Sequence, residues 1–175
     1  KRFRTSLVLC NMSNEFDVPD GLRAVLTLDD AESNLSIVTV IVDPEKKGEL
    51  ISIAALAEEE ISKLIVVALA HPDRRGAFEE LIANQLTFHQ KVEVFKRLIP
   101  DFEPQADKYQ GHLQFLAALK KLRNTAAHSY GMSPDDALKL KRDSEIVQLA
   151  ADFPKSAWTR MEKLRDFLQP HVPTE

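Results

Sequence analysis

The chain has 175 residues, enough for one domain with a substantial core, and its single cysteine, Cys10, cannot form a disulfide within the chain. Its formal net charge of -4 disfavours a protein that coats nucleic acid non-specifically, and its low count of 5 glycines disfavours a turn-rich all-β fold. No apolar run approaches the ~20 residues that a membrane-spanning helix needs. We therefore expect a mainly α-helical protein of the cytoplasm that does not enter a membrane.

The structure of residues 1–42 is the least defined by the sequence. Residues 18–21, which include Pro19 and Gly21, are typical of a turn. Residues 35–42 are rich in β-branched side chains and alternate apolar with small polar residues in their middle, as a strand does, yet a helix fits them equally well. We treat residues 1–42 as an N-terminal extension that is either helical or partly β, such as a short hairpin packed on a helical body.

From Asp43 onward the sequence favours helices. Asp43 is a suitable N-cap, followed by a proline at the first helical position and an acid in the first turn. These signals predict a helix over residues 44–70. The pair His71-Pro72 ends it. Its core stripe consists of apolar residues that recur at helical spacing: Leu50, Ile53, Ala54, Ala57, Ile61, Leu64, Ile65 and Ala68.

Two further helices are predicted before residue 104. The first covers residues 73–84 and turns three apolar side chains inward: Phe78, Leu81 and Ile82. The second begins with a capping box, in which the Thr87 hydroxyl accepts from the Gln90 amide and the Gln90 side chain returns to the Thr87 amide. Pro100 is expected to end it. Its core face carries Phe88, Val92, Phe95 and Ile99.

Three more helices complete a predicted antiparallel bundle over residues 43–170, which a tail of residues 171–175 follows. The first of them carries the stripe Tyr109, Leu113, Leu116, Leu119, Leu122 and Ala126. The next is N-capped by Ser133, has a proline and two acids in its first turn, and runs to Ala150. The last follows Pro154, and its inner face carries Trp158, Met161, Leu164, Arg165 and Leu168.

The stretch from Leu122 to Gly131, near the predicted end of the long helix, is the one place with a chemical interpretation. On a helix, Asn124 and His128 are four residues apart and share a face, while the Arg123 side chain must curl around to join them. The last turn of a helix favours a protonated imidazole, which suits an acid near neutral pH. Arg123 would place a permanent positive charge where the transition state of phosphodiester cleavage builds negative charge.

Arg123, four intervening residues and His128, with polar Asn124 directly after the arginine, resemble the signature of HEPN-type domains. The resemblance covers roughly residues 45–168 and implies an all-helical fold. Active members of that family are metal-independent ribonucleases, often toxins of toxin–antitoxin or defence systems. Tyr130 makes the pattern similar to that of HEPN toxins paired with nucleotidyltransferase antitoxins. The resemblance implies that Tyr130 is the target of adenylylation.

The first functional hypothesis is a homodimeric endoribonuclease in which the RNA 2′-hydroxyl attacks the neighbouring phosphate and leaves a cyclic phosphate. Arg123 would stabilise the phosphate charge, His128 would act as acid and base, Asn124 would orient, and Tyr130 would support the site or be modified. One histidine cannot easily serve as both acid and base, so two copies across a two-fold axis would supply two. Nearby cations could extend an RNA groove: Lys120, Lys121, Lys139, Lys141 and Arg142.

The second hypothesis is a non-catalytic regulator or adaptor that binds a protein partner through the same surface. A mannitol-operon repressor group has a similar fold, and the acidic balance of the chain fits this alternative slightly better. The partner would be an antitoxin or a regulatory protein. The five histidines show no metal-binding spacing and the lone cysteine excludes a CxxC zinc site, so we expect neither a metal nor a cofactor.

Overall fold

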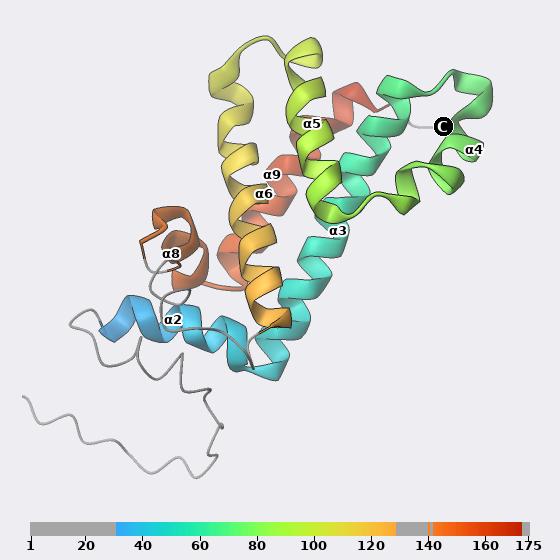
Figure 1. Cartoon of the computed structure of the whole chain (residues 1–175). Coiled ribbons are helices and arrows are strands. Elements are labelled where there is room, and N and C mark those ends of the chain that lie inside the picture. The colour runs from blue at the N-terminus through green and yellow to red at the C-terminus, as the bar shows by residue number, and fades with distance from the viewer. Residues whose placement is uncertain (1–30, 129–139, 141, 173–175) are drawn as a thin grey trace, which may run out of the picture.

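The computed structural model describes residues 31–128, 140 and 142–172, with side chains from residue 36 onward. In these residues it contains seven α-helices, three short 3₁₀ helices and no strand, so the predicted mainly α-helical class is confirmed (Figure 1). The α-helices are α2 (Ala31–Val42), α3 (Pro44–Leu69), α4 (Arg75–Leu81), α5 (Phe88–Phe102), α6 (Ala106–Ala127), α8 (Ser144–Ala151) and α9 (Lys155–Leu168). The 3₁₀ helices are η1 (Pro72–Arg74), η2 (Ala83–Gln85) and η4 (Gln169–His171).

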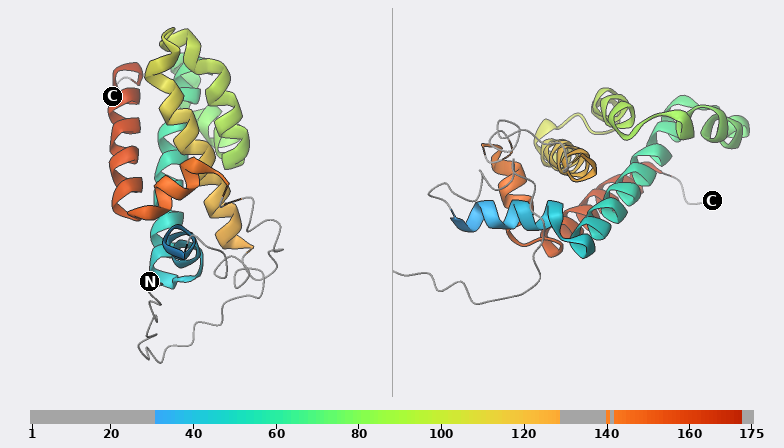
Figure 2. Two further views of the ribbon diagram at one scale, coloured as in Figure 1. Left: turned by 90° about the vertical axis from the view of Figure 1, so that its left-hand side faces the viewer. Right: turned by 60° about the horizontal axis from the view of Figure 1, so that its bottom comes forward.

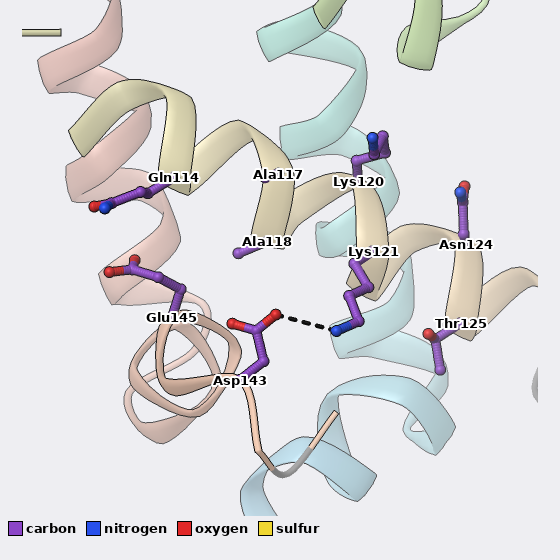
Figure 3. A pocket seen from close by; sticks show the side chains of 9 residues that line it. All are labelled: Gln114, Ala117, Ala118, Lys120, Lys121, Asn124, Thr125, Asp143 and Glu145. Atoms are coloured by element: carbon purple, nitrogen blue, oxygen red, sulfur yellow. Dashed lines mark hydrogen bonds and ion pairs between the residues drawn. The ribbon is translucent and has the colours of Figure 1, made fainter. Parts of the chain in front are cut away.

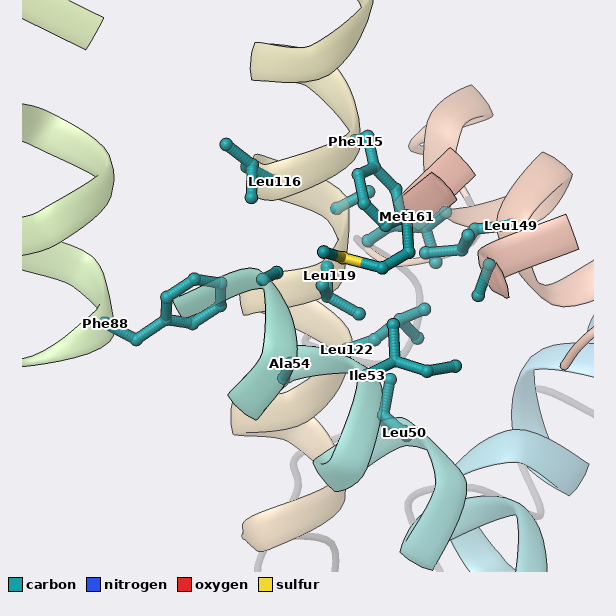
Figure 4. Packing of buried hydrophobic residues seen from close by; sticks show 14 of the residues in the cluster. Leu50, Ile53, Ala54, Phe88, Phe115, Leu116, Leu119, Leu122, Leu149 and Met161 are labelled. Atoms are coloured by element: carbon teal, nitrogen blue, oxygen red, sulfur yellow. The ribbon is translucent and has the colours of Figure 1, made fainter. Parts of the chain in front are cut away.

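α3 is the central helix, because it packs against α2, α5, α6 and α9. α5 and α6 lie side by side and run in opposite directions (Figure 1). α9 lies on the other side of α3 and α6 from α5, and α2 crosses one end of the bundle (Figure 2). Side chains of these helices meet in one core, shown around Leu119 and Met161 in Figure 4. Within the described ranges, no helix combines the length and the apolar character that crossing a membrane requires.

Residues 35–42 form part of α2, so the choice between helix and strand falls to the helix. Ile37, Val38 and Ile41 are buried in the same core as the helices that follow. Their spacing is that of one helix face, and α2 packs on both α3 and α8. Burial on this face outweighs the weak strand propensity of β-branched residues. The described part of the predicted N-terminal extension is therefore packed on the helical body.

Local capping signals define where α3 and α5 begin. Oδ1 of Asp43 accepts from the backbone N–H groups of Glu45 at 2.9 Å and Lys46 at 3.2 Å, so α3 begins as predicted. The capping box of α5 is also confirmed: the Gln90 N–H donates to Thr87 Oγ1 at 3.3 Å, and the Thr87 N–H donates to Gln90 Oε1 at 2.8 Å. The apolar face predicted for α5 is buried: Phe88, Val92, Phe95 and Ile99.

The helix predicted over residues 73–84 is shorter than expected, and two of its three inward residues were assigned wrongly. α4 has seven residues and lies between η1 and η2. Leu81 is 67% exposed and Ile82 is 49% exposed, whereas Phe78 is partly buried. Among the elements that the structure describes, α4 packs mainly against α3 and the turns beside it, so its outer side remains open (Figure 1).

Pro100 does not end its helix, contrary to the prediction. α5 continues to Phe102, and the Glu103 N–H donates to the Ile99 carbonyl at 2.9 Å. A proline in the last turn removes only one backbone donor. The carbonyl that this donor would have met belongs to Lys96, an exposed residue, where water can replace the lost bond.

The helix predicted from Ser133 to Ala150 is interrupted within its described part, and its predicted start lies outside the described residues. A turn at Arg142 separates Leu140 from α8. Asp143 then caps α8, because its Oδ1 accepts from the Ile146 N–H at 3.4 Å. A second local capping signal therefore begins a new helix where periodicity alone predicted a continuous one.

α9 follows Pro154 as predicted, but two residues of its inner face were assigned wrongly. Met161, Leu164 and Leu168 are buried. Trp158 is 36% exposed, and its indole N–H donates to a Glu49 carboxylate oxygen at 3.3 Å. Arg165 is exposed as well. The indole has a polar group that must keep a partner, which favours the margin of the core over its interior.

Candidate functional site

The end of α6 carries Asn124 and His128 on an exposed face. His128 is the C-cap residue of α6, and its N–H donates to the carbonyl oxygens of Asn124 and Thr125, both at 3.2 Å. Asn124 and His128 are both exposed. At 3.6 residues per turn they lie about 40° apart around the helix axis, so the two side chains can act on one ligand.

Arg123 is directed toward α5. Its guanidinium Cζ lies 5.7 Å from the centroid of the Phe88 ring, within the range of a cation–π contact. Phe88 is the first residue of α5 and is only 3% exposed, so the ring is a fixed support. Arg123 and His128 are five residues apart, which places them about 140° apart around α6. The contacts that the structure describes bring Arg123 to Phe88, whereas the expected curl toward His128 is not among them.

Lys120 also reaches α5. Its Nζ lies 3.0 Å from Nδ1 of His89, the second residue of α5. His89 is exposed and Lys120 is half-buried. The pairs Lys120–His89 and Arg123–Phe88 are neighbours, because α5 and α6 run side by side in opposite directions (Figure 1). Two cations and an imidazole thus gather where α5 begins.

Lys121 faces the opposite flank of α6, toward α8. Its Nζ donates to Oδ2 of Asp143 at 3.1 Å, and both side chains are partly exposed. The pair bridges a groove of about 540 Å³ between α6 and the start of α8 (Figure 3). Glu145, at the side of this groove, is bound by Arg160 at 2.6 Å. The groove is lined by Gln114, Ala117, Ala118, Lys120, Lys121, Asn124, Thr125, Asp143 and Glu145.

Some predicted site residues fall outside the described part of the chain. Tyr130, Lys139 and Lys141 are among them, as is Gly131, the expected helix end. Arg142 is described and is exposed beside Asp143. Of the predicted cations, those on α6 are therefore split between two flanks: Arg123 and Lys120 face α5, and Lys121 faces α8.

The sequence did not identify the residues of neighbouring helices that contact the motif. Phe88 and His89 were assigned to the core face and capping segment of α5, and nothing in their spacing indicates that they meet α6. Asp143 could have been found, because an acid before Ser144 and Glu145 is itself a helix-start signal. The stronger signal at Ser133 concealed it.

Among the residues described, no three His, Cys, Asp or Glu side chains gather closely enough to hold a metal ion. The arrangement on α6 offers a different chemistry: an exposed imidazole, an exposed amide and several cations within three turns of one helix. Comparisons of the chain with protein-family models, with curated proteins and with solved structures find no match.

Proposed function

We propose that the protein is a metal-independent endoribonuclease of the HEPN type, acting as a homodimer and serving as a toxin or defence protein. The observation that carries the proposal is the exposure of His128 and Asn124 together on the last turn of α6. Cationic side chains occupy the turn before them, at Lys120, Lys121 and Arg123. An imidazole beside fixed positive charge is the combination that metal-free cleavage of a phosphodiester needs.

In the proposed reaction the RNA 2′-hydroxyl oxygen attacks the adjacent phosphorus, and the bond from phosphorus to the 5′-oxygen breaks. A His128 imidazole takes the proton of the 2′-hydroxyl, and an imidazolium gives a proton to the departing 5′-oxygen. The products are a 2′,3′-cyclic phosphate and a free 5′-hydroxyl. Arg123 offsets the charge that builds on the phosphate oxygens, and Asn124 donates an amide N–H that orients the phosphate.

The reaction needs one histidine as base and another as acid. A two-fold dimer that brings two α6 ends together supplies both histidines and two arginines. The monomer alone has a single exposed histidine on this face. Cleavage per mole of protein should therefore rise with protein concentration until the dimer is saturated. Tyr130, two residues after His128, is the proposed acceptor of an adenylyl group from an antitoxin partner, which would switch the site off.

The test is incubation of purified protein with single-stranded and structured RNA in the presence of EDTA, followed by identification of the product ends. The parent protein should leave cyclic phosphates. His128→Ala and Arg123→Ala should each lower the rate by about 10²-fold or more. His71→Ala is the matched control, because His71 is an exposed histidine outside the motif. If both motif variants, once shown to fold, cleave like the parent, the proposal fails.

A second candidate is the non-catalytic regulator or adaptor, and one observation favours it, although at a surface beside α4 and not at the motif surface where the sequence led us to expect the partner. Leu81 and Ile82 are exposed at the edge of the molecule, a place where an apolar surface can receive a protein partner. On this view the parent protein leaves RNA intact even at high concentration. A double variant, Leu81→Ser with Ile82→Ser, should then keep its thermal stability and lose its partner. Partner binding unchanged by the double variant would exclude this surface.

A further inference from the structure

Two cross-helix contacts lie next to each other where α5 begins. Arg123 rests its guanidinium 5.7 Å from the Phe88 ring centroid, and Lys120 places its ammonium 3.0 Å from the His89 ring. Lys120 and Arg123 are three residues apart, and Phe88 and His89 are consecutive. The four side chains therefore form one cluster, which we call the α5–α6 cationic cluster.

The α5–α6 cationic cluster presents donors and few acceptors. An ammonium can only donate, so the contact with Lys120 uses Nδ1 of His89 as an acceptor and leaves Nε2 as the ring nitrogen that can donate. The Lys120 ammonium keeps two further N–H groups, and the guanidinium of Arg123 has five. The ligand that fits such a set carries several acceptor oxygens and negative charge. A phosphate group has both.

The cations on the other flank of α6 are engaged differently. Lys121 is held by the carboxylate of Asp143 at 3.1 Å. Within the described residues, neither Lys120 nor Arg123 forms an ion pair with a carboxylate. The positive charge of the α5–α6 cationic cluster is thus not neutralised there, while that of Lys121 is. An incoming phosphate meets no bound acid that it must displace at Lys120 and Arg123.

The cluster also has a fixed geometry. Phe88 is buried and begins α5, so it holds the Arg123 side chain against a rigid surface. The backbone of His89 lies between Thr87 and Gln90, the two residues of the capping box that begins α5. Preorganised side chains lose little conformational entropy when a ligand binds. Lys120 of the cluster lies about 12 Å along α6 from His128, counted as eight residues of 1.5 Å rise.

We propose that the α5–α6 cationic cluster, through Lys120, His89 and Arg123, binds a backbone phosphate of the RNA strand beside the scissile nucleotide. This inference rests on the proposed ribonuclease function and adds the path of the substrate to it. The strand passes from the exposed end of α6, at His128, over the flank that faces α5. Along α6, Arg123 lies between Lys120 and His128, with its guanidinium on the flank that faces α5. Lys121, which is already paired with Asp143 in the groove beside α8, is not on this path.

The experiment measures binding without turnover, in protein that carries His128→Ala. A fluorescein-labelled single-stranded RNA of mixed sequence is titrated, and its anisotropy is followed at several salt concentrations. In this background Lys120→Gln and His89→Ala are compared with Lys96→Gln, a matched control at an exposed lysine about two turns along α5 from the cluster. We expect Lys120→Gln to raise Kd several-fold and to reduce the slope of log K against log salt by about 0.7, the value for one lost contact with a single strand. His89→Ala should raise Kd without a matching change in the slope.

Lys120→Arg provides the second variant, because it keeps the charge and should restore the parent slope even if Lys120→Gln disturbs folding. Equal Kd and slope for the cluster variants and Lys96→Gln would overturn the inference, as would failure of the His128→Ala protein to bind RNA. The proposed function fails separately. If the unmodified protein never cleaves RNA but the binding data follow the expected pattern, the phosphate site stands and the nuclease does not. If cleavage occurs and the cluster variants bind like the control, only the path of the strand is wrong.

Discussion

Lys91 of α5 donates its ammonium to Glu58 of α3, with Nζ 2.9 Å from Oε1, and Lys91 is only 5% exposed. The Glu58 side chain is 25% exposed, so the two ends of the pair differ in their access to water. α3 and α5 pack against each other. The pair therefore places a buried cation between the two helices, where its partner must stay in position.

Removing the acid should cost more than removing the lysine. Glu58→Ala leaves the Lys91 ammonium buried without its counter-charge, and we expect a loss of about 3 kcal/mol in the free energy of unfolding. Lys91→Met keeps the aliphatic shape and leaves a carboxylate that can still reach water, so we expect a loss of about 1 kcal/mol. Urea unfolding followed by circular dichroism gives both values.

The double variant Glu58→Leu with Lys91→Met serves as the control, because an apolar pair of similar volume often replaces a buried ion pair at little cost. It should be more stable than Glu58→Ala. If Glu58→Ala and Lys91→Met lower the free energy of unfolding by the same small amount, the Lys91 ammonium must be hydrated when Glu58 is absent.

The capping box of α5 should contribute measurably to the free energy of unfolding. It also begins the helix turn whose residues contact α6. Thr87→Ala removes the acceptor of the Gln90 N–H, and we expect the free energy of unfolding to fall by about 1 kcal/mol. Thr87→Ser keeps an oxygen in the same place and should cost only a few tenths of this. Thermal unfolding of the two variants in parallel checks the prediction, and equal stability of both would show that the cap contributes nothing.

Local signals in the sequence were sufficient for the starts of α3 and α5 and for most buried faces. Asp43 and Thr87 each begin a helix by accepting a hydrogen bond from a backbone N–H within three residues. Their effect therefore does not depend on tertiary contacts. The same reasoning failed at Leu81, because its exposure depends on tertiary packing, and among the described elements α4 packs mainly against α3 and the turns beside it. Local signals also could not decide between helix and strand for residues 35–42, because that choice depends on the packing of α2 against α8.

The candidate site was predictable along one helix and not between helices. The i, i+4 relation of Asn124 and His128 follows from helix geometry alone, and both residues are exposed as a ligand would require. The contact of Arg123 with Phe88 depends on how α5 and α6 align, which no spacing within α6 encodes. The ion pair of Lys91 could not be predicted either. Its aliphatic stem lies on the buried side of α5, while its ammonium binds Glu58, 33 residues away in the sequence.

His112 makes the stability of the α6–α9 contact depend on pH. Its ring stacks on Phe167 with centroids 4.7 Å apart. Burial, together with the positive charges of Arg160 and Lys163, lowers the pKa of His112 below its ordinary value of 6.5. In the unfolded chain the ring takes up a proton near pH 6.5, whereas the folded protein resists that proton. The free energy of unfolding is therefore highest above the ordinary histidine pKa of 6.5. It decreases as the pH falls below that value, until the His112 ring is protonated in the folded protein as well.

We therefore expect the free energy of unfolding to fall between pH 7.5 and pH 5.5, a range chosen around the ordinary histidine pKa of about 6.5. The slope should be no steeper than one proton allows. His112→Gln should remove this part of the dependence, so the difference between the two curves isolates His112. Glu103 does not interfere: the Gln105 N–H and Lys108 lower its pKa below 4.5, so its contribution is lost only in more acidic solution. Parallel curves for the parent and His112→Gln would contradict the prediction.

Asp143 has two structural roles that substitution can separate. Its Oδ1 accepts from the Ile146 N–H at 3.4 Å as the N-cap of α8, and its Oδ2 binds Lys121 of α6 at 3.1 Å. Asp143→Asn keeps an oxygen for the cap and removes the charge of a partly exposed pair, so we expect a loss of no more than about 1 kcal/mol in unfolding free energy. Asp143→Ala removes both interactions and should cost about 1–2 kcal/mol.

The stability losses caused by the two substitutions should also depend differently on salt concentration. The loss caused by Asp143→Asn is electrostatic and should shrink toward zero at 1 M NaCl, where the Debye length is about 3 Å. The loss caused by Asp143→Ala should keep its capping part at every salt concentration. Lys121→Ala, which removes the pair and leaves the cap, should follow Asp143→Asn in both size and salt dependence. If Lys121→Ala and Asp143→Asn instead respond to salt in opposite directions, the pair does not hold α8 against α6, and the groove between them owes its shape to the buried apolar residues alone.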